Sequence, residues 1–225
     1  RIIRSIFGLY KDINILIVDD NSPDQTASKV IELQATYKEK LYLQIRKVKS
    51  GLGPAYIHGF KWALNRDYSY VFEMDADFSH NPADLVRLYN ANEEKGGDLS
   101  VGSRYVKGVN IINWPMSRLL LSFFASKYVR LITGMPINDS TAGFKCYKRE
   151  VLETINLDEI QFVGYAFQIE MKFKAWKYGF NIIEVPVIFT DRSEGESKMS
   201  GGIFYEAVLG VINMKIRSIF KNWKR

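Results

Sequence analysis

Apolar, β-branched runs alternate with helical patterns along almost the whole sequence, and this alternation limits the folds open to the chain. The run Ile13–Val18 is apolar without interruption, which is typical of a strand buried on both faces. Further strands are predicted at Leu41–Val48, Tyr70–Met74, Leu99–Ser103, Ala142–Tyr147 and Ile182–Phe189. The pattern predicts an α/β fold in which helices cover both faces of a mostly parallel sheet. No linker or repeat interrupts it, so residues 1–225 are expected to form a single domain.

Composition excludes several kinds of protein and site. A single cysteine, Cys146, cannot form an internal disulfide or a thiolate metal site, and two histidines are too few for a histidine-rich zinc centre. The longest stretch without Asp, Glu, Lys or Arg is about eleven residues, whereas a membrane-spanning helix needs about 20, so none is expected. With no disulfide and no leader sequence, a cytosolic protein is expected. The net charge of +6 predicts an anionic partner: a nucleotide, a phospholipid surface or a nucleic acid.

Two segments interrupt the alternation. Residues 114–135 and 203–225 are apolar and aromatic, with basic residues spaced through them. This composition is that of an amphipathic helix lying in a membrane interface. The same composition also suits helices that pack on the sheet or on a second subunit. Periodicity alone favours this second interpretation.

Two acids follow the strand Tyr70–Met74. Asp75 and Asp77 are two residues apart, so in an extended chain both side chains lie on one face. Two carboxylates converging at the end of a buried strand repel each other, and Mg²⁺ or Mn²⁺ with bound phosphates would relieve the repulsion. The alternative is an Asp-rich turn that caps the helix beginning at Asn81.

Other polar residues follow the neighbouring strands. Asp19 and Asp20 come after Ile13–Val18, where their oxygens could bind a nucleoside or simply form a turn. Basic side chains that could bind phosphate, or be ordinary surface charges, are Arg104, Arg118, Arg192 and Lys198. Asp139 lies in a turn before the predicted strand Ala142–Tyr147.

Seven motifs in order resemble one family. They are VDDNSPDQTA (Val18–Ala27), KSGLGPA (Lys49–Ala55), MDADFSHNP (Met74–Pro82), VGSRYVKG (Val101–Gly108), DSTAGFKCY (Asp139–Tyr147), GYAFQIEM (Gly164–Met171) and FTDRSEGESKM (Phe189–Met199). Together they resemble the inverting family-2 glycosyltransferases of GT-A fold, and within these the polyprenol phosphate mannose synthases. The resemblance implies a three-layer sandwich and the transfer of mannose from GDP-mannose to a polyprenyl phosphate.

The resemblance also implies roles for individual residues. Asp75 and Asp77 would hold Mg²⁺ or Mn²⁺ on the donor diphosphate. The nucleotide sugar would be bound by Val18, Asp19, Asp20, Lys49, Ala76 and the two metal-binding acids, with Arg192 and Lys198 on its phosphates. The lipid phosphate would be received by Arg104, Arg118 and Ser122. Catalysis would come from Asp77, Arg192 and Lys198, with Asp139 orienting groups near the acceptor.

The same resemblance implies a location in the cell, and the sequence differs from the family in one respect. It favours the membrane-interface interpretation of 114–135 and 203–225, with the protein peripheral at the cytoplasmic face of a membrane. The family's first strand, which ends in a Pro-x-Tyr-Asn-Glu-like motif, has no counterpart here. A central sheet lacking that strand is therefore expected.

The sequence leaves two other functions open. One is transfer of glucose or another sugar from a UDP-sugar to the same kind of lipid. The other is a non-enzymatic module that binds anionic lipid or nucleic acid through its basic surface. No nucleic-acid partner is expected, because base-reading and RNA-binding motifs are absent from the sequence.

Overall fold

The computed structural model describes residues 1–191 and 201–224, with side chains described for 1–191 and 208–224. Its strands are β1 (Ile15–Asp19), β2 (Leu41–Ile45), β3 (Tyr70–Glu73), β4 (Leu99–Ser103), β5 (Ile111–Ile112), β6 (Lys145–Lys148), β7 (Ile182–Pro186) and β8 (Phe189–Thr190). Its α-helices are α1 (Ile2–Leu9), α2 (Thr26–Tyr37), α3 (Leu52–Leu64), α4 (Leu85–Glu93), α5 (Met116–Thr133), α6 (Arg149–Thr154), α7 (Ala166–Lys177) and α8 (Gly201–Phe220). Short 3₁₀ turns lie at Lys38–Lys40, Pro82–Asp84 and Leu157–Glu159.

A four-stranded sheet in the order β3-β6-β4-β7 forms the centre of the molecule. β6 runs antiparallel to both of its neighbours, while β4 and β7 are parallel. The strands β3, β4 and β7 therefore share one direction and end at the same edge. This confirms the predicted α/β fold with a mostly parallel sheet, to which β6 is the exception.

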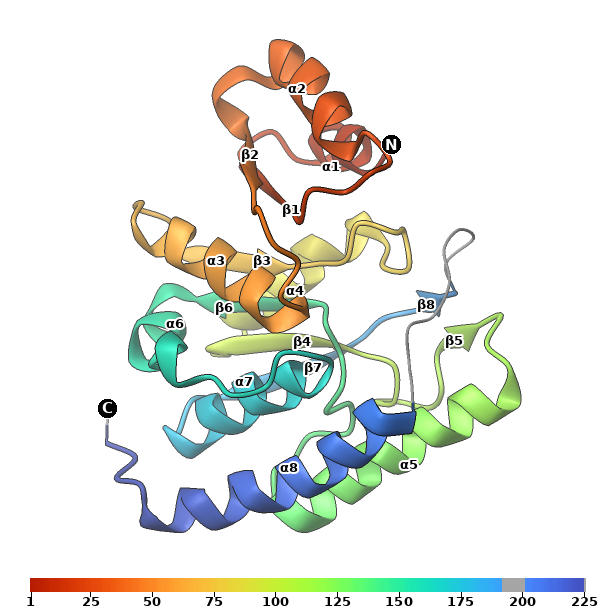
Figure 1. The fold of residues 1–225 in the computed structure, drawn as a ribbon, viewed down its shortest axis with the longest axis vertical. Coiled ribbons are helices and arrows are strands. Elements are labelled where there is room, and N and C mark those ends of the chain that lie inside the picture. Colours follow the sequence, from red (N-terminus) through yellow and green to blue (C-terminus); the bar gives the residue numbers. More distant parts are fainter. Residues whose placement is uncertain (192–200, 225) are drawn as a thin grey trace.

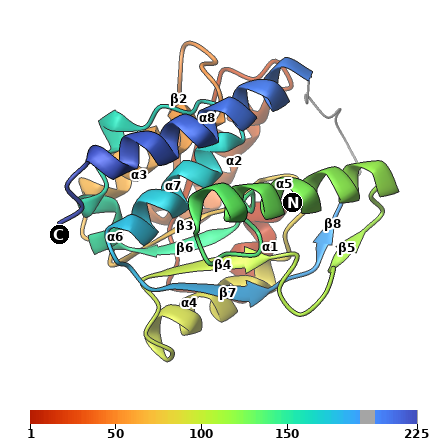
Figure 2. The ribbon, with the colours of Figure 1, turned by 90° about the horizontal axis from the view of Figure 1, so that it is seen from below.

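Helices cover the two faces of this sheet (Figures 1 and 2). The strand β6 shows why, because its successive side chains point to opposite faces. Tyr147 packs with Phe60 of α3 and Phe167 of α7, whereas Cys146 packs with Leu88 of α4. The sheet thus lies between two helical layers, as a three-layer sandwich requires.

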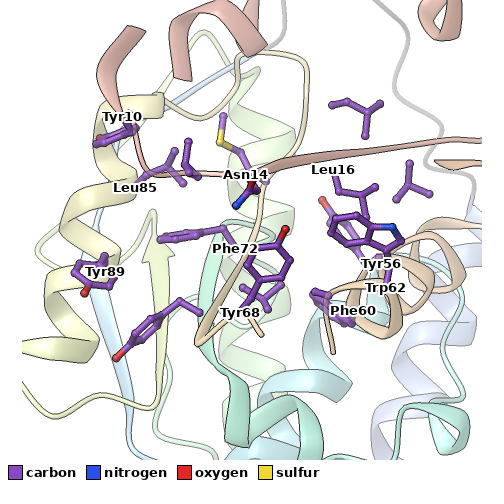
Figure 3. Close-up of a pocket in the computed structure, with 18 of the residues that line it drawn as sticks. Tyr10, Asn14, Leu16, Tyr56, Phe60, Trp62, Tyr68, Phe72, Leu85 and Tyr89 are labelled. Carbon is purple, nitrogen blue, oxygen red and sulfur yellow. The ribbon is translucent and has the colours of Figure 1, made fainter. Parts of the chain in front are cut away.

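The strands β1 and β2 form a separate parallel pair, which lies with α1 and α2 at one end of the molecule (Figure 1). Within the described residues β1 does not pair with β3, and a cavity of about 850 Å³ lies between them. Apolar and aromatic side chains line this hollow, among them Leu16 from β1, Tyr56 and Phe60 from α3, and Phe72 from β3 (Figure 3). The central sheet therefore does not continue from β3 to β1 in the described residues.

The helices α5 and α8 lie side by side along one edge of the sandwich (Figures 1 and 2). Val129 of α5 and Val211 of α8 are buried against Ile169 and Phe173 of α7. Both helices also leave large apolar side chains exposed: Met116, Leu120, Leu121, Phe124 and Leu131 on α5, and Leu209, Ile212, Ile216, Ile219 and Phe220 on α8. Both helices therefore pack on the sandwich, and the membrane-interface interpretation of 114–135 and 203–225 stays a prediction. No helix in the described part of the chain has the length and hydrophobicity needed to cross a membrane.

Two glycines of α3 predict opposite effects on stability. A methyl group at Gly59 would meet Val18 and Leu16 at 3.6 and 3.7 Å, which is ordinary contact, and alanine favours a helix. A methyl group at Gly53 would lie 2.5 Å from the carbonyl oxygen of Phe162, so the backbone would have to shift.

We therefore expect Gly59→Ala to raise the free energy of unfolding by about 0.5–1 kcal/mol. Gly53→Ala should lower it by about 1–3 kcal/mol. Urea unfolding followed by circular dichroism measures both. Equal effects of the two substitutions would contradict the packing of α3 described above.

Candidate functional site

A cavity of about 180 Å³ lies at the edge of the sheet where β3 and β4 end. It brings together residues that lie far apart in the sequence. The predicted site residues that line it are Asp75, Asp77, Arg104, Arg118 and Ser122. The two acids predicted to bind metal and the three residues predicted to receive the lipid phosphate thus share one cavity.

The two acids are held by uncharged donors. Oδ1 of Asp75 accepts a hydrogen bond from the Tyr56 hydroxyl at 2.8 Å. Oδ1 of Asp77 accepts from the backbone N–H of Ser79 at 3.0 Å and from its hydroxyl at 2.6 Å. These contacts fix the orientation of both carboxylates, and neither acid forms an ion pair among the described residues.

His80 is buried at the wall of the same cavity. Its ring contacts Phe144 and Phe189, and its Nδ1 has no hydrogen-bond partner among the described residues. Burial lowers the pKa of His80, and the positive charge of Arg104 lowers it further, against the opposing effect of Asp75. The neutral imidazole is therefore favoured.

Arg104 is fixed by a buried ion pair. Its Nε and Nη2 donate to the two carboxylate oxygens of Asp139 at 2.7 and 2.6 Å, and its backbone N–H donates to Oδ2 at 2.9 Å. Nη2 also donates to the Thr141 hydroxyl. Burial raises the pKa of Asp139, but the charge and hydrogen bonds of Arg104 outweigh it and hold that pKa below its usual value. The geometry places Asp139 as the residue that orients Arg104.

Arg118 reaches the cavity from α5. Its Nη1 lies 2.9 Å from Oδ1 of Asp191, and its guanidinium lies 4.2 Å from the centre of the Trp114 ring. The side chain is 29% exposed, in contrast to the buried Arg104. Arg118 is therefore the more accessible of the two arginines.

The predicted nucleotide-binding residues lie at the ends of β1 and β2. Asp20 is held by Arg46, whose Nε and Nη2 donate to its two oxygens at 2.6 and 2.9 Å. Asp19 is buried and accepts from the backbone N–H of Ser22, whereas Lys49 is exposed between β2 and α3. Val18 lines the hollow beside β1, as do Asp75 and Ala76 from the other side. Arg192 and Lys198 lie outside the described residues.

Sequence reasoning missed Arg46 and a buried cluster behind the acids. Arg46 follows β2, which pairs in parallel with β1 so that Ile45 lies opposite Asp19, and this register could have predicted the ion pair. In the buried cluster, Glu73 at the end of β3 lies 3.0 Å from Nζ of Lys145, and both contact Gln168. Burial raises the pKa of Glu73 and lowers that of Lys145, while the attraction between the two opposes both shifts.

The donor set fits a hard divalent cation that arrives with phosphates. No group of three or more His, Cys, Asp or Glu residues suited to a metal was found among the described residues. Mg²⁺ is usually bound through one or two carboxylates together with substrate phosphates and water. Oδ2 of Asp75 and Oδ2 of Asp77 accept no hydrogen bond from the described residues, and they suit this mode, in which a bound diphosphate supplies the remaining ligands.

The chain is similar in sequence to known glycosyltransferases. Residues 1–155 match the model of "Glycosyl transferase family 2". The chain is 46% identical over 205 residues to "Polyprenol monophosphomannose synthase" of Mycolicibacterium smegmatis, covering 91% of this chain and 77% of the relative. It is 44% identical over 198 residues to "Undecaprenyl-phosphate mannosyltransferase" of Micrococcus luteus, covering 88% of this chain and 80% of the relative.

Solved structures with the same fold include glucosyl-3-phosphoglycerate synthase from Mycobacterium tuberculosis. Its complex with phosphoglyceric acid matches with a TM-score of 0.65 at 15% identity, covering 98% of this chain and 75% of that chain. Another match is the complex of that enzyme with Mn²⁺, UDP and glucosyl-3-phosphoglycerate, with a TM-score of 0.65 at 16% identity and the same coverage. At this identity the likeness bears on the fold.

The buried ion pair predicts a large effect on stability. Asp139→Asn leaves the guanidinium of Arg104 buried without its counter-charge, so we expect the free energy of unfolding to fall by about 3–5 kcal/mol. Asp158→Asn is the matched control, because Asp158 pairs with Lys61 at the surface, where such pairs contribute little. Urea unfolding at neutral pH checks both, and a loss no larger for Asp139→Asn than for the control would contradict the assignment.

The same pair predicts a pH dependence. Because the folded-state pKa of Asp139 is lowered, its contribution to stability is complete above the unfolded-state pKa and is lost as the pH falls through the folded-state value. The difference in unfolding free energy between wild type and Asp139→Asn should therefore shrink below about pH 4. A difference that stays constant between pH 7 and pH 3 would contradict this.

Proposed function

Because this chain belongs to glycosyl transferase family 2, we propose that it transfers a mannosyl group from GDP-mannose to a polyprenyl phosphate. The observation that carries the proposal is the cavity that joins an acid pair to accessible arginine. The names of the two curated relatives, each more than 40% identical over most of this chain, support mannose as the sugar and a polyprenyl phosphate as the acceptor.

The donor end of the site consists of Asp75 and Asp77. These carboxylates would hold Mg²⁺ or Mn²⁺ against the diphosphate of GDP-mannose, with Val18, Asp19, Asp20, Lys49 and Ala76 toward the nucleoside and Arg192 and Lys198 toward the phosphates. When bound, the cation neutralises charge that develops on the leaving diphosphate. The acids stay anchored through Tyr56 and Ser79, so the site needs little rearrangement when the donor arrives.

The acceptor end consists of Arg118 and Ser122, with Arg104 behind them. Arg118 can bind the lipid phosphate through two parallel donors, and its stacking on Trp114 keeps the guanidinium in place. A phosphate oxygen of the lipid then attacks the anomeric carbon while the bond from that carbon to the diphosphate breaks, which inverts the configuration. The attacking phosphate is largely ionised near pH 7, so no protein base is required to remove a proton.

The helix α5 connects this chemistry to a membrane surface. Arg118, Leu121 and Ser122 line the cavity, and Leu121 and Phe124 are among the exposed apolar side chains of the same helix. Exposed basic residues accompany them: Lys127 and Arg130 on α5, Arg217 on α8 and Lys224 beyond it. Apolar side chains among cations are what an anionic lipid surface binds. The protein would lie peripherally at the cytoplasmic face, where the polyprenyl tail stays in the bilayer and its phosphate enters the cavity.

A product assay tests the proposal. The protein is incubated with a short polyprenyl phosphate and a panel of GDP- and UDP-sugars, with Mg²⁺, Mn²⁺ or EDTA, and mass spectrometry detects the glycosyl phospholipid. We expect a mannosyl product that disappears in EDTA and in Asp77→Ala, whose folding circular dichroism verifies. A glucosyl product would show that the transferred sugar is glucose instead of mannose. Salt-dependent binding of lipid or nucleic acid without any product would favour a binding module instead.

Substitution of Arg118 tests the acceptor end separately. Arg118→Ala should lower kcat/KM for the lipid phosphate about 10-fold while leaving KM for GDP-mannose nearly unchanged, because a charge-assisted contact to the phosphate is lost. Arg4→Ala, which changes an exposed arginine of α1 outside the cavity, is the matched control and should have little effect. Equal effects of Arg118→Ala on the use of both substrates would contradict the assignment of Arg118 to the acceptor site.

A further inference from the structure

The acids around the site differ in what holds them. Three of them are anchored by arginine, in the pairs Asp20–Arg46, Asp139–Arg104 and Asp191–Arg118. Asp75 is anchored instead by a phenol, since its Oδ1 accepts from the Tyr56 hydroxyl at 2.8 Å. A neutral donor fixes the direction of a carboxylate and leaves its charge to attract a cation, whereas an arginine would cancel that charge.

Tyr56 is itself held firmly. Its ring is nearly parallel to that of Phe167, at an angle of 2° with 6.0 Å between ring centres, and Phe60 lies 6.2 Å away on its own helix. The helix α3 that carries Tyr56 is fixed at its start, where the N–H of Gly53 donates to the carbonyl of Val163 at 2.9 Å. The Tyr56 side chain is therefore fixed by aromatic packing and by the position of its helix.

The second oxygen of Asp75 lies on the side of the cavity. Oδ2 is 4.0 Å from the position that a Cβ atom would occupy at Gly143, and Gly143 lines the cavity together with Asp77 and Gln168. The Tyr56 contact thus holds one oxygen of Asp75 and leaves the other available there.

We propose that Tyr56 is a positioning residue for the donor site, which orients Asp75 so that its Oδ2 serves the divalent cation. This inference rests on the proposed function, because the cation arrives with the nucleotide diphosphate. It predicts that loss of the phenolic hydroxyl weakens cation binding while the fold and the reacting groups stay intact. Partners of this kind, one contact removed from the metal, typically change metal affinity 10- to 100-fold.

The experiment compares Tyr56→Phe with Tyr147→Phe. Both substitutions remove one phenolic hydroxyl from the same aromatic cluster, where Tyr147 is fully buried and Tyr56 is partly buried. The Tyr147 hydroxyl bonds to Glu73 rather than to Asp75. Electron paramagnetic resonance of free Mn²⁺, in the presence of GDP and without acceptor, measures the Mn²⁺ dissociation constant. We expect about a 10-fold increase for Tyr56→Phe and less than about a 2-fold change for Tyr147→Phe.

Steady-state kinetics supply a second readout. For Tyr56→Phe, the Mn²⁺ concentration that gives half-maximal rate should rise by the same factor, while kcat at saturating Mn²⁺ stays within about 2-fold of wild type. A lower kcat with unchanged Mn²⁺ affinity would overturn the inference, and so would equal weakening by Tyr147→Phe.

Asp77→Ala separates failure of this inference from failure of the proposed function. If Asp77→Ala abolishes Mn²⁺ binding and Tyr56→Phe binds like wild type, the metal site stands and the role of Tyr56 is refuted. If wild type with GDP binds no Mn²⁺, the metal site itself is refuted, and the role of Tyr56 with it.

Discussion

The buried ion pair between Arg104 and Asp139 joins the end of β4 to the turn that precedes β6, and the cavity is built around it. Two charges removed from water must satisfy each other, and here both carboxylate oxygens accept from the guanidinium while a backbone N–H adds a third contact. Thr141, which also contacts Arg104, lines the cavity. The position of this wall therefore depends on an electrostatic constraint rather than on apolar packing alone.

The same requirement is met at the reversed strand β6. It lies between β3 and β4, so Lys145 comes to rest against Glu73 and both are completely buried. Gln168 from α7 completes the cluster directly behind the acids that follow β3. Charges that would be costly to bury singly are thus paired at one edge of the sheet. The acid pair at the cavity lies beside this cluster, and neither of its acids forms an ion pair within the described residues.

Much of the architecture could be predicted because it follows from local pattern. The alternation of strands and helices gave the α/β fold, and the rule that parallel strands end at a common edge explains why Asp75 and Arg104 meet. The resemblance implied acceptor roles for Arg118 and Ser122, which lie on α5, far along the chain from β3. Asp75, Asp77, Arg104, Arg118 and Ser122 do share one cavity, whereas Asp19, Asp20 and Lys49 do not line it, and the individual roles remain predictions.

What could not be predicted depends on contacts between distant segments. The predicted strand Ile182–Phe189 is divided in the structure, and Pro186, which has no N–H to donate, ends its first part. Lys145 and Lys172 are fully buried, contrary to the usual exposure of lysine, because α7 and β6 are enclosed and Lys172 donates to the carbonyl of Ala142. The Tyr56–Asp75 contact likewise joins α3 to the end of β3 and leaves no periodic signal in the sequence.

The proposed function requires that the acids at the end of β3 hold a cation together with the donor. Crystals grown with GDP-mannose and Mn²⁺, with diffraction recorded at the manganese absorption edge, test it without any assay of turnover. We expect an anomalous peak within coordination distance of carboxylate oxygens of both Asp75 and Asp77, adjacent to diphosphate density. Diphosphate density with no peak at these acids, or a peak bound elsewhere, would contradict it.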